Sequence, residues 1–132
     1  MTVFVDTSAL LALLDADDAE HADAVAAWGE LAEEGAPLLS SNYVIVETTA
    51  VAQHRLGLDA IRALVRDILP LVEIAFIDSA IHEGAIAALL AAGRRQLSLV
   101  DCSSFELMRR REVSRAFAFD RHFREQKFTL RA

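Results

Sequence analysis

The chain has 132 residues, of which 54% are hydrophobic and 25% are charged. This length and apolar content predict one compact domain over residues 1–132 and exclude disordered, collagen-like and repeat proteins. The formal net charge of −7 argues against a generally basic nucleic-acid-binding protein.

The expected elements alternate between strands and helices. In chain order they are a strand at 2–5, a helix capped by Thr7 or Ser8 that ends at 14, a helix opened by Asp17 and Asp18 that ends at Gly35, a strand at 37–39, a helix capped by Ser41 or Asn42 that ends near 56, a helix at 58–69 ended by Pro70, a strand at 71–77, an Ala-rich helix capped by Asp78 or Ser79 that ends at Gly93, a helix at 99–111, and strands at 115–119 and 129–130. Trp28 is expected in the core. This alternation predicts an α/β protein with a parallel sheet.

The compartment follows from the cysteine content and the apolar segments. The single cysteine, Cys102, has no partner for a disulfide and cannot form a zinc site of paired thiolates, so we expect it to be a small buried hydrophobic residue. The N-terminus lacks a basic start and its apolar run stops at Asp6, which argues against a signal peptide. The longest charge-free apolar helix candidate, residues 84–93, is far shorter than the roughly 20 residues of a membrane span. We expect a cytoplasmic protein that does not contact a membrane.

Charge is unevenly distributed along the chain. Residues 1–50 hold ten acids and no Lys or Arg, whereas the chain from Arg94 onward has nine Arg and one Lys against five acids, a local balance of +5. Such a basic third would suit a polyanion. The arginines are also expected at solvated helix ends, where they favour the helix dipole, and this interpretation is the simpler one.

Four acids occupy unusual places in this pattern. Asp6 and Asp120 follow expected strands, at the sheet edge where α/β proteins bind ligands. Glu47 and Asp101 fall on apolar helix faces, where an unpaired carboxylate is costly to bury. If the four carboxylates converge, their mutual repulsion requires a positive charge, and the only lysine, Lys127, lies near the C-terminus. Mg²⁺ or Mn²⁺ would supply that charge and would suit the hydrolysis of a phosphodiester.

Simpler roles exist for each of these residues. Helix capping accounts for Asp6 or Ser8 taken alone, and a solvent-facing boundary position would account for Glu47 or Asp101. Asp120 could merely begin a turn. The four histidines show no paired ligand spacing and are expected to be surface or supporting residues: His21, His54, His82 and His122.

Four sequence blocks together resemble the PIN-domain ribonucleases of the VapC toxin type. They are Val-Phe-Val-Asp-Thr-Ser-Ala-Leu at 3–10, Val-Glu at 46–47, Leu-Val-Asp at 99–101 and Ala-Phe-Asp-Arg-His-Phe at 118–123. The resemblance implies a three-layer α/β/α sandwich with a central, mainly parallel sheet. It also implies a Mg²⁺- or Mn²⁺-dependent endoribonuclease site. Asp6 and Asp101 would be the principal metal ligands, Asp120 and Glu47 would assist, and Ser8 would orient a carboxylate or a water molecule.

The same resemblance implies partners. It suggests a small VapB-like antitoxin, which would place a group near the acids, and a homodimer, while RNA would be the substrate. Two other functions remain open at this point. One is a phosphatase or phosphoacceptor domain, although such a phosphatase needs a second Asp where this chain has Ser8 and both classes need a suitable Lys. The other is a binding module that holds a partner's basic side chain in an acidic cleft.

Overall fold

The computed structural model describes residues 1–130, and its centre is a five-stranded sheet in the order β3-β2-β1-β4-β5. The strands are β1 (Val3–Val5), β2 (Leu38–Ser41), β3 (Val72–Ala75), β4 (Arg115–Phe117) and β5 (Thr129–Leu130). Every neighbouring pair is parallel, and Phe4 in the central strand is in register with Leu39 of β2 and Ala116 of β4. The expected parallel sheet is confirmed.

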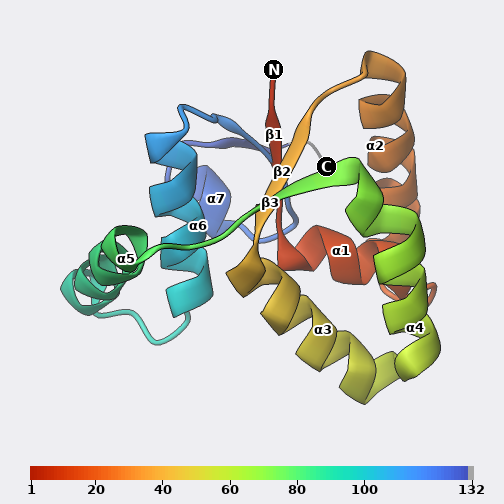
Figure 1. The fold of residues 1–132 in the computed structure, drawn as a ribbon, viewed down its shortest axis with the longest axis horizontal. Helices are drawn as coiled ribbons and strands as arrows, with labels where there is room; N and C mark the ends of the chain where they lie inside the picture. Colours follow the sequence, from red (N-terminus) through yellow and green to blue (C-terminus); the bar gives the residue numbers. More distant parts are fainter. Residues whose placement is uncertain (131–132) are drawn as a thin grey trace.

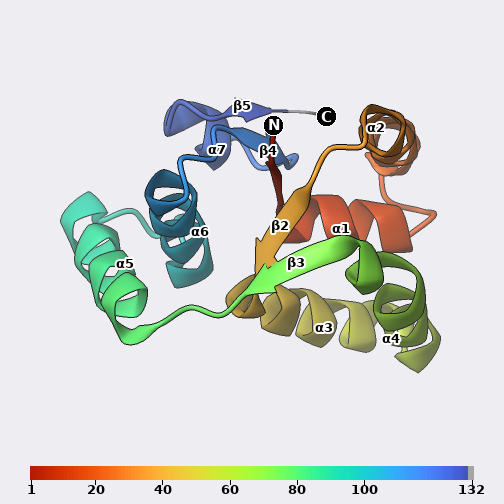
Figure 2. The same cartoon turned by 45° about the horizontal axis from the view of Figure 1, so that its top comes forward.

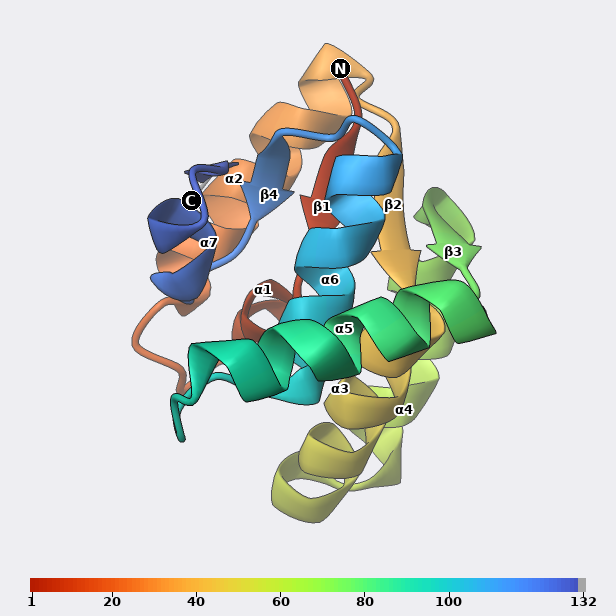
Figure 3. The same cartoon turned by 90° about the vertical axis from the view of Figure 1, so that its left-hand side faces the viewer.

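Helices cover both faces of this sheet. They are α1 (Thr7–Leu14), α2 (His21–Glu34), α3 (Asn42–Leu56), α4 (Leu58–Ala63), α5 (Ser79–Ala92), α6 (Leu99–Arg110) and α7 (His122–Glu125). Figures 1 and 2 show α5 and α6 on one side of the sheet and α1, α2 and α4 on the other. Figure 3 shows α6 against the sheet with α5 packed outside it. The three-layer α/β/α arrangement is therefore confirmed. None of the helices within residues 1–130 combines the length and apolar character needed to cross a membrane.

The core is built on the central strand and a group of phenylalanines. Val3, Phe4 and Val5 are fully buried. The ring of Phe123 packs against Phe4, Phe105 and Phe128, with centroid distances of 6.3, 5.0 and 6.3 Å. Because Phe123 belongs to α7, this aromatic group fixes the short helix against the sheet and sets the position of the residues around it.

Two helix starts differ from the sequence expectation. Asp6, rather than Thr7 or Ser8, caps α1, because its carboxylate accepts the backbone N–H of Ser8. The second helix begins at His21 instead of at residue 17. The carboxylates of Asp15 and Asp18 accept nearby backbone N–H groups and hold residues 15–20 in turns, an alternative to the helix that short acidic side chains favour.

Three later elements also differ. The expected helix at 58–69 divides into α4, a π-helical turn at Leu64–Ile68 and a 3-10 turn at Leu69–Leu71 that includes Pro70. The fourth strand ends at Phe117, earlier than expected, and α7 was not expected at all. Trp28 is only partly buried: it packs against the core and its ring lies 6.3 Å from that of Phe117.

Candidate active site

One pocket of about 300 Å³ gathers the residues singled out from the sequence, at the edge of the sheet where β1, β2 and β4 end. It is lined by Asp6, Thr7, Ser8, Leu11, Glu47, Val51, Arg55, Ser98, Asp101 and Asp120. All four acids and Ser8 are thus brought together from segments up to 114 residues apart in the chain. We call this the acidic pocket.

Asp6 lies deepest in the acidic pocket, with only 3% of its surface exposed. Its Oδ2 accepts hydrogen bonds from the backbone N–H and the hydroxyl of Ser8, at 3.1 and 2.7 Å. Ser8 Oγ in turn accepts the backbone N–H of Phe119 at 2.9 Å, which ties the segment before Asp120 to the start of α1. The pKa of Asp6 is raised to about 7, mainly by burial; the hydrogen bonds from Ser8 oppose this shift, and the charges of Asp101 and Asp120 add to it.

Asp101 is buried in the first turn of α6, where it forms a capping box with Ser98. Its Oδ2 accepts the backbone N–H of Ser98 at 3.1 Å, and Ser98 Oγ accepts the backbone N–H of Asp101 at 3.0 Å. Burial raises the pKa of Asp101, and the charge of Asp120 adds to this effect, while the backbone hydrogen bond at Ser98 opposes it. The solvent-facing boundary position considered for Asp101 is therefore wrong, since 8% of the residue is exposed.

Glu47 and Asp120 lie nearer the mouth of the acidic pocket. Glu47 is half-buried on α3, whose next residue, Thr48, donates from Oγ1 to Thr7 Oγ1 at 3.1 Å and so fixes α3 beside α1. The side chain of Asp120 is 27% exposed, and its Oδ1 accepts the backbone N–H of His122 at 2.9 Å. That hydrogen bond forms the turn that leads into α7.

Sequence reasoning missed two residues at this site. His122, expected to be a surface or supporting residue, is buried, and its Nε2 lies 3.9 Å from Asp120 Oδ1. The spacing of two residues between Asp120 and His122 was the available signal. Arg55 lines the acidic pocket two helical turns after Glu47 on α3, so helical phase alone could have indicated it.

The side chains of the acidic pocket fit a hard divalent cation. Four carboxylates converge with Arg55 as the one lining cation among residues 1–130, and the raised pKa values of Asp6 and Asp101 indicate that their negative charges are not fully compensated by protein groups. Carboxylate oxygens are the donors that Mg²⁺ and Mn²⁺ prefer. Asp101, Asp120 and His122 each offer a ligand atom within 4.8 Å of the others.

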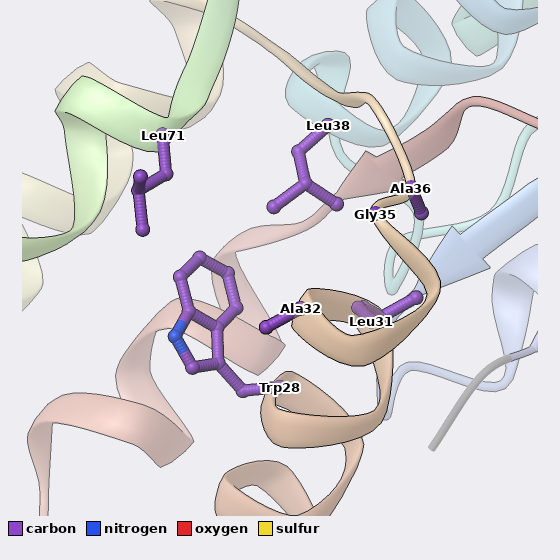
Figure 4. Close-up of a pocket in the computed structure, with 7 residues that line it drawn as sticks. All are labelled: Trp28, Leu31, Ala32, Gly35, Ala36, Leu38 and Leu71. Carbon is purple, nitrogen blue, oxygen red and sulfur yellow. The ribbon is translucent and has the colours of Figure 1, made fainter.

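A second pocket of about 300 Å³ is apolar and lies between α2, β2 and the 3-10 turn. In Figure 4 the side chains of Trp28, Leu38 and Leu71 face a common space beside the C-terminal end of α2. It holds no ionisable side chain among its lining residues, so it suits contact with an apolar surface rather than catalysis.

Comparison with known proteins assigns the family. The PIN domain model matches residues 3–128. The chain is 33% identical over 122 residues to the 23S rRNA-specific endonuclease VapC20 of two Mycobacterium tuberculosis strains, covering 92% of this chain and 91% of that protein. The crystal structure of M. tuberculosis VapC20, described as a sarcin-ricin loop cleaving toxin, superimposes with a TM-score of 0.86 at 32% identity over 96% of each chain. The structure of FitAcB from Neisseria gonorrhoeae shares the fold, with a TM-score of 0.70 at 18% identity over 100% of this chain and 97% of that one. The chain belongs to the PIN-domain family, as its four sequence blocks predicted.

Proposed function

We propose that the chain is an endoribonuclease that requires Mg²⁺ or Mn²⁺ and acts as the toxin of a VapBC-type pair. The observation that carries the proposal is the convergence of Asp6, Glu47, Asp101 and Asp120 in one pocket of a PIN-domain chain. Similarity to an rRNA endonuclease over nine-tenths of the chain supports the same conclusion. The phosphatase and phosphoacceptor alternatives have no support from the family match.

The residues of the acidic pocket have different roles in this proposal. Asp6 and Asp101 are the principal metal ligands, Asp120 and Glu47 assist, and Ser8 holds Asp6 in place through its hydroxyl. When bound, a divalent ion supplies Lewis acidity toward a phosphoryl oxygen and lowers the pKa of a water molecule. Arg55 lines the same pocket and has no hydrogen bond or ion pair within residues 1–130, so its guanidinium is available to an RNA phosphate.

Ribosomal RNA is the substrate to test first. VapC20 is described as specific for 23S rRNA and as cleaving the sarcin-ricin loop. We propose that this chain also cleaves a structured RNA loop of this kind. The contacts that select a sequence lie on loops and arginines, where two chains of 33% identity can differ.

Cleavage of purified rRNA by partner-free protein tests the function. We expect discrete fragments with Mg²⁺ or Mn²⁺, none with EDTA, and a loss of at least about a hundredfold in Asp6→Asn and Asp101→Asn, because each removes a charged oxygen from the pocket. Asp17→Asn is the matched control, since Asp17 is exposed in the turn before α2. Intact RNA from folded wild-type protein under every condition would contradict the proposal and favour a binding role for the acidic pocket.

The resemblance to VapC proteins supports four further proposals about context. The chain acts in the cytoplasm as a single domain spanning residues 1–132, a homodimer is its working form, and a small antitoxin restrains it. Exposed Val46, Phe76 and Leu90, at 68%, 77% and 76%, and the apolar pocket of Figure 4 are available to protein partners. Light scattering of the purified chain tests the dimer. Co-expression with any small protein encoded next to this chain tests the antitoxin, which should co-purify and suppress cleavage; absence of such a protein would contradict this proposal.

A further inference from the structure

His122 is a buried histidine with a ring nitrogen that is unpaired among the described residues. The side chain is 8% exposed, and the buried Nδ1 has no hydrogen-bond partner within residues 1–130. Its Nε2 comes no closer than 3.9 Å to Asp120 Oδ1. Buried polar atoms are almost always paired, so a buried imidazole that lies beside Asp120 of the acidic pocket with its Nδ1 unpaired within residues 1–130 indicates that the ring binds a ligand.

The two ring nitrogens face in different directions. Nε2 lies 3.9 Å from Asp120 Oδ1, and one ring nitrogen of His122 forms, with one oxygen each of Asp101 and Asp120, a group of three possible ligand atoms within 4.8 Å of one another. Nδ1 faces Glu125, whose Oε1 is 3.7 Å away. Glu125 is held by Arg94, which donates from Nη1 to Oε2 at 3.0 Å and so fixes the carboxylate beside the ring.

Metal-binding histidines have the same arrangement, in which the imidazole lies between the ligand group on one side and a carboxylate on the other. Such a histidine uses one nitrogen for the ion and donates the other N–H to a carboxylate, which fixes the tautomer and the ring orientation. The aromatic packing of Phe123 and the hydrogen bond from His122 N to Asp120 Oδ1 fix the backbone on both sides of the ring. The imidazole is thus preorganised to reach the same ion as Asp101 and Asp120.

We propose that His122 Nε2 is a metal ligand of the acidic pocket, beside Asp101 and Asp120, and that Glu125 accepts its Nδ1–H. The inference rests on the metal dependence proposed above, and it changes the kind of ion expected. Imidazole nitrogen is a poorer donor for Mg²⁺ than for first-row transition metals, whereas an all-oxygen site suits Mg²⁺ well. A site with one imidazole therefore favours Mn²⁺ over Mg²⁺.

Pulsed electron paramagnetic resonance of bound Mn²⁺ tests the ligand directly, without RNA. We expect modulation from a directly bound ¹⁴N nucleus in the wild-type protein, and its replacement by ¹⁵N coupling when the protein is labelled with ¹⁵N-histidine. Asp101→Asn should weaken Mn²⁺ binding, which assigns the ion to the acidic pocket. Because the labelling uses wild-type protein, the test does not depend on any histidine variant folding.

Calorimetric titration adds a second measurement. His122→Gln should lose the nitrogen coupling and bind Mn²⁺ about tenfold or more weakly, with a smaller loss for Mg²⁺. Glu125→Gln should bind Mn²⁺ about 10- to 100-fold more weakly and keep the coupling. His82→Gln is the matched control, because His82 bonds to Tyr43 on α3 and is not part of the group formed by Asp101, Asp120 and His122.

The outcomes separate this inference from the proposed function. Mn²⁺ bound in the acidic pocket without nitrogen coupling would overturn the inference and leave an all-oxygen site that can still cleave RNA. Failure of the wild-type protein to bind Mn²⁺ at all would overturn it as well. Nitrogen coupling in a protein that cleaves no RNA would support the inference and contradict the endoribonuclease.

Discussion

Asp6→Asn should stabilise the metal-free protein, and more strongly at high pH. Burial raises the pKa of the Asp6 carboxyl from 3.8 to about 7 in the folded chain. Between these two values the folded state holds a proton that the unfolded state has released, so stability falls as the pH rises toward 7. The stabilising contribution is complete below 3.8 and is lost as the pH passes through about 7. An asparagine keeps a hydrogen-bond acceptor for Ser8 and removes the charge.

The magnitude follows from the two pKa values. A difference of about 3 units corresponds to a charge-burial penalty of about 4 kcal/mol when Asp6 is fully ionised in the folded state. The penalty rises by about 2.6 kcal/mol between pH 5 and pH 8. With an unfolding entropy of about 2.1 cal/mol/K per residue, this rise corresponds to a shift of about 9 °C in the Tm difference between variant and wild type.

Thermal unfolding in EDTA at pH 5 and pH 8 checks this prediction. The quantity to compare is the Tm of Asp6→Asn minus that of the wild type, because effects of the substitution that do not depend on pH cancel between the two conditions. Asp17→Asn, which replaces an exposed acid, is the matched control. A difference for Asp6→Asn that stays constant between pH 5 and pH 8 would refute the reasoning that Asp6 is an uncompensated buried carboxyl.

Three further substitutions test the pocket and the core. Arg55→Gln should weaken RNA binding and reduce the slope of the logarithm of the binding constant against the logarithm of the salt concentration by about 0.7, because one phosphate contact is lost. Arg62→Gln, on the neighbouring helix, should change neither quantity. Fluorescence anisotropy at several salt concentrations measures both variants. Phe123→Ala should lower the free energy of unfolding in urea by about 3–5 kcal/mol, because Phe123 is fully buried among three other rings. Gly84→Ala in α5 should raise it by up to about 1 kcal/mol, since the new Cβ would meet only the flexible end of Glu106, at 3.3 Å; a loss of stability would show that Glu106 cannot move.

The order of strands and helices could be predicted because local patterns decide it. Gly35 and Gly93 end α2 and α5 in the left-handed conformation, with φ of 66° and 62°, as their place after apolar helical stretches indicated. The burial of His122 could not be predicted in this way. It depends on the packing of Phe123 against Phe4 and Phe105, and those rings come from distant parts of the chain.

The choice between helix cap and site residue, which the sequence posed for Asp6, is not a real alternative in this fold. In a parallel sheet the strands end at the same edge. The helices that begin there have unpaired backbone N–H groups in their first turn. A carboxylate there satisfies such a group with one oxygen and leaves the other for the pocket. Asp6 accepts the N–H of Ser8 and Asp101 that of Ser98 at helix starts, and Asp120 accepts that of His122 in the turn before α7, so each side chain is oriented by a bond to a nearby backbone N–H. Capping therefore supplies the rigidity that a metal site needs, and the same carboxylates serve both purposes.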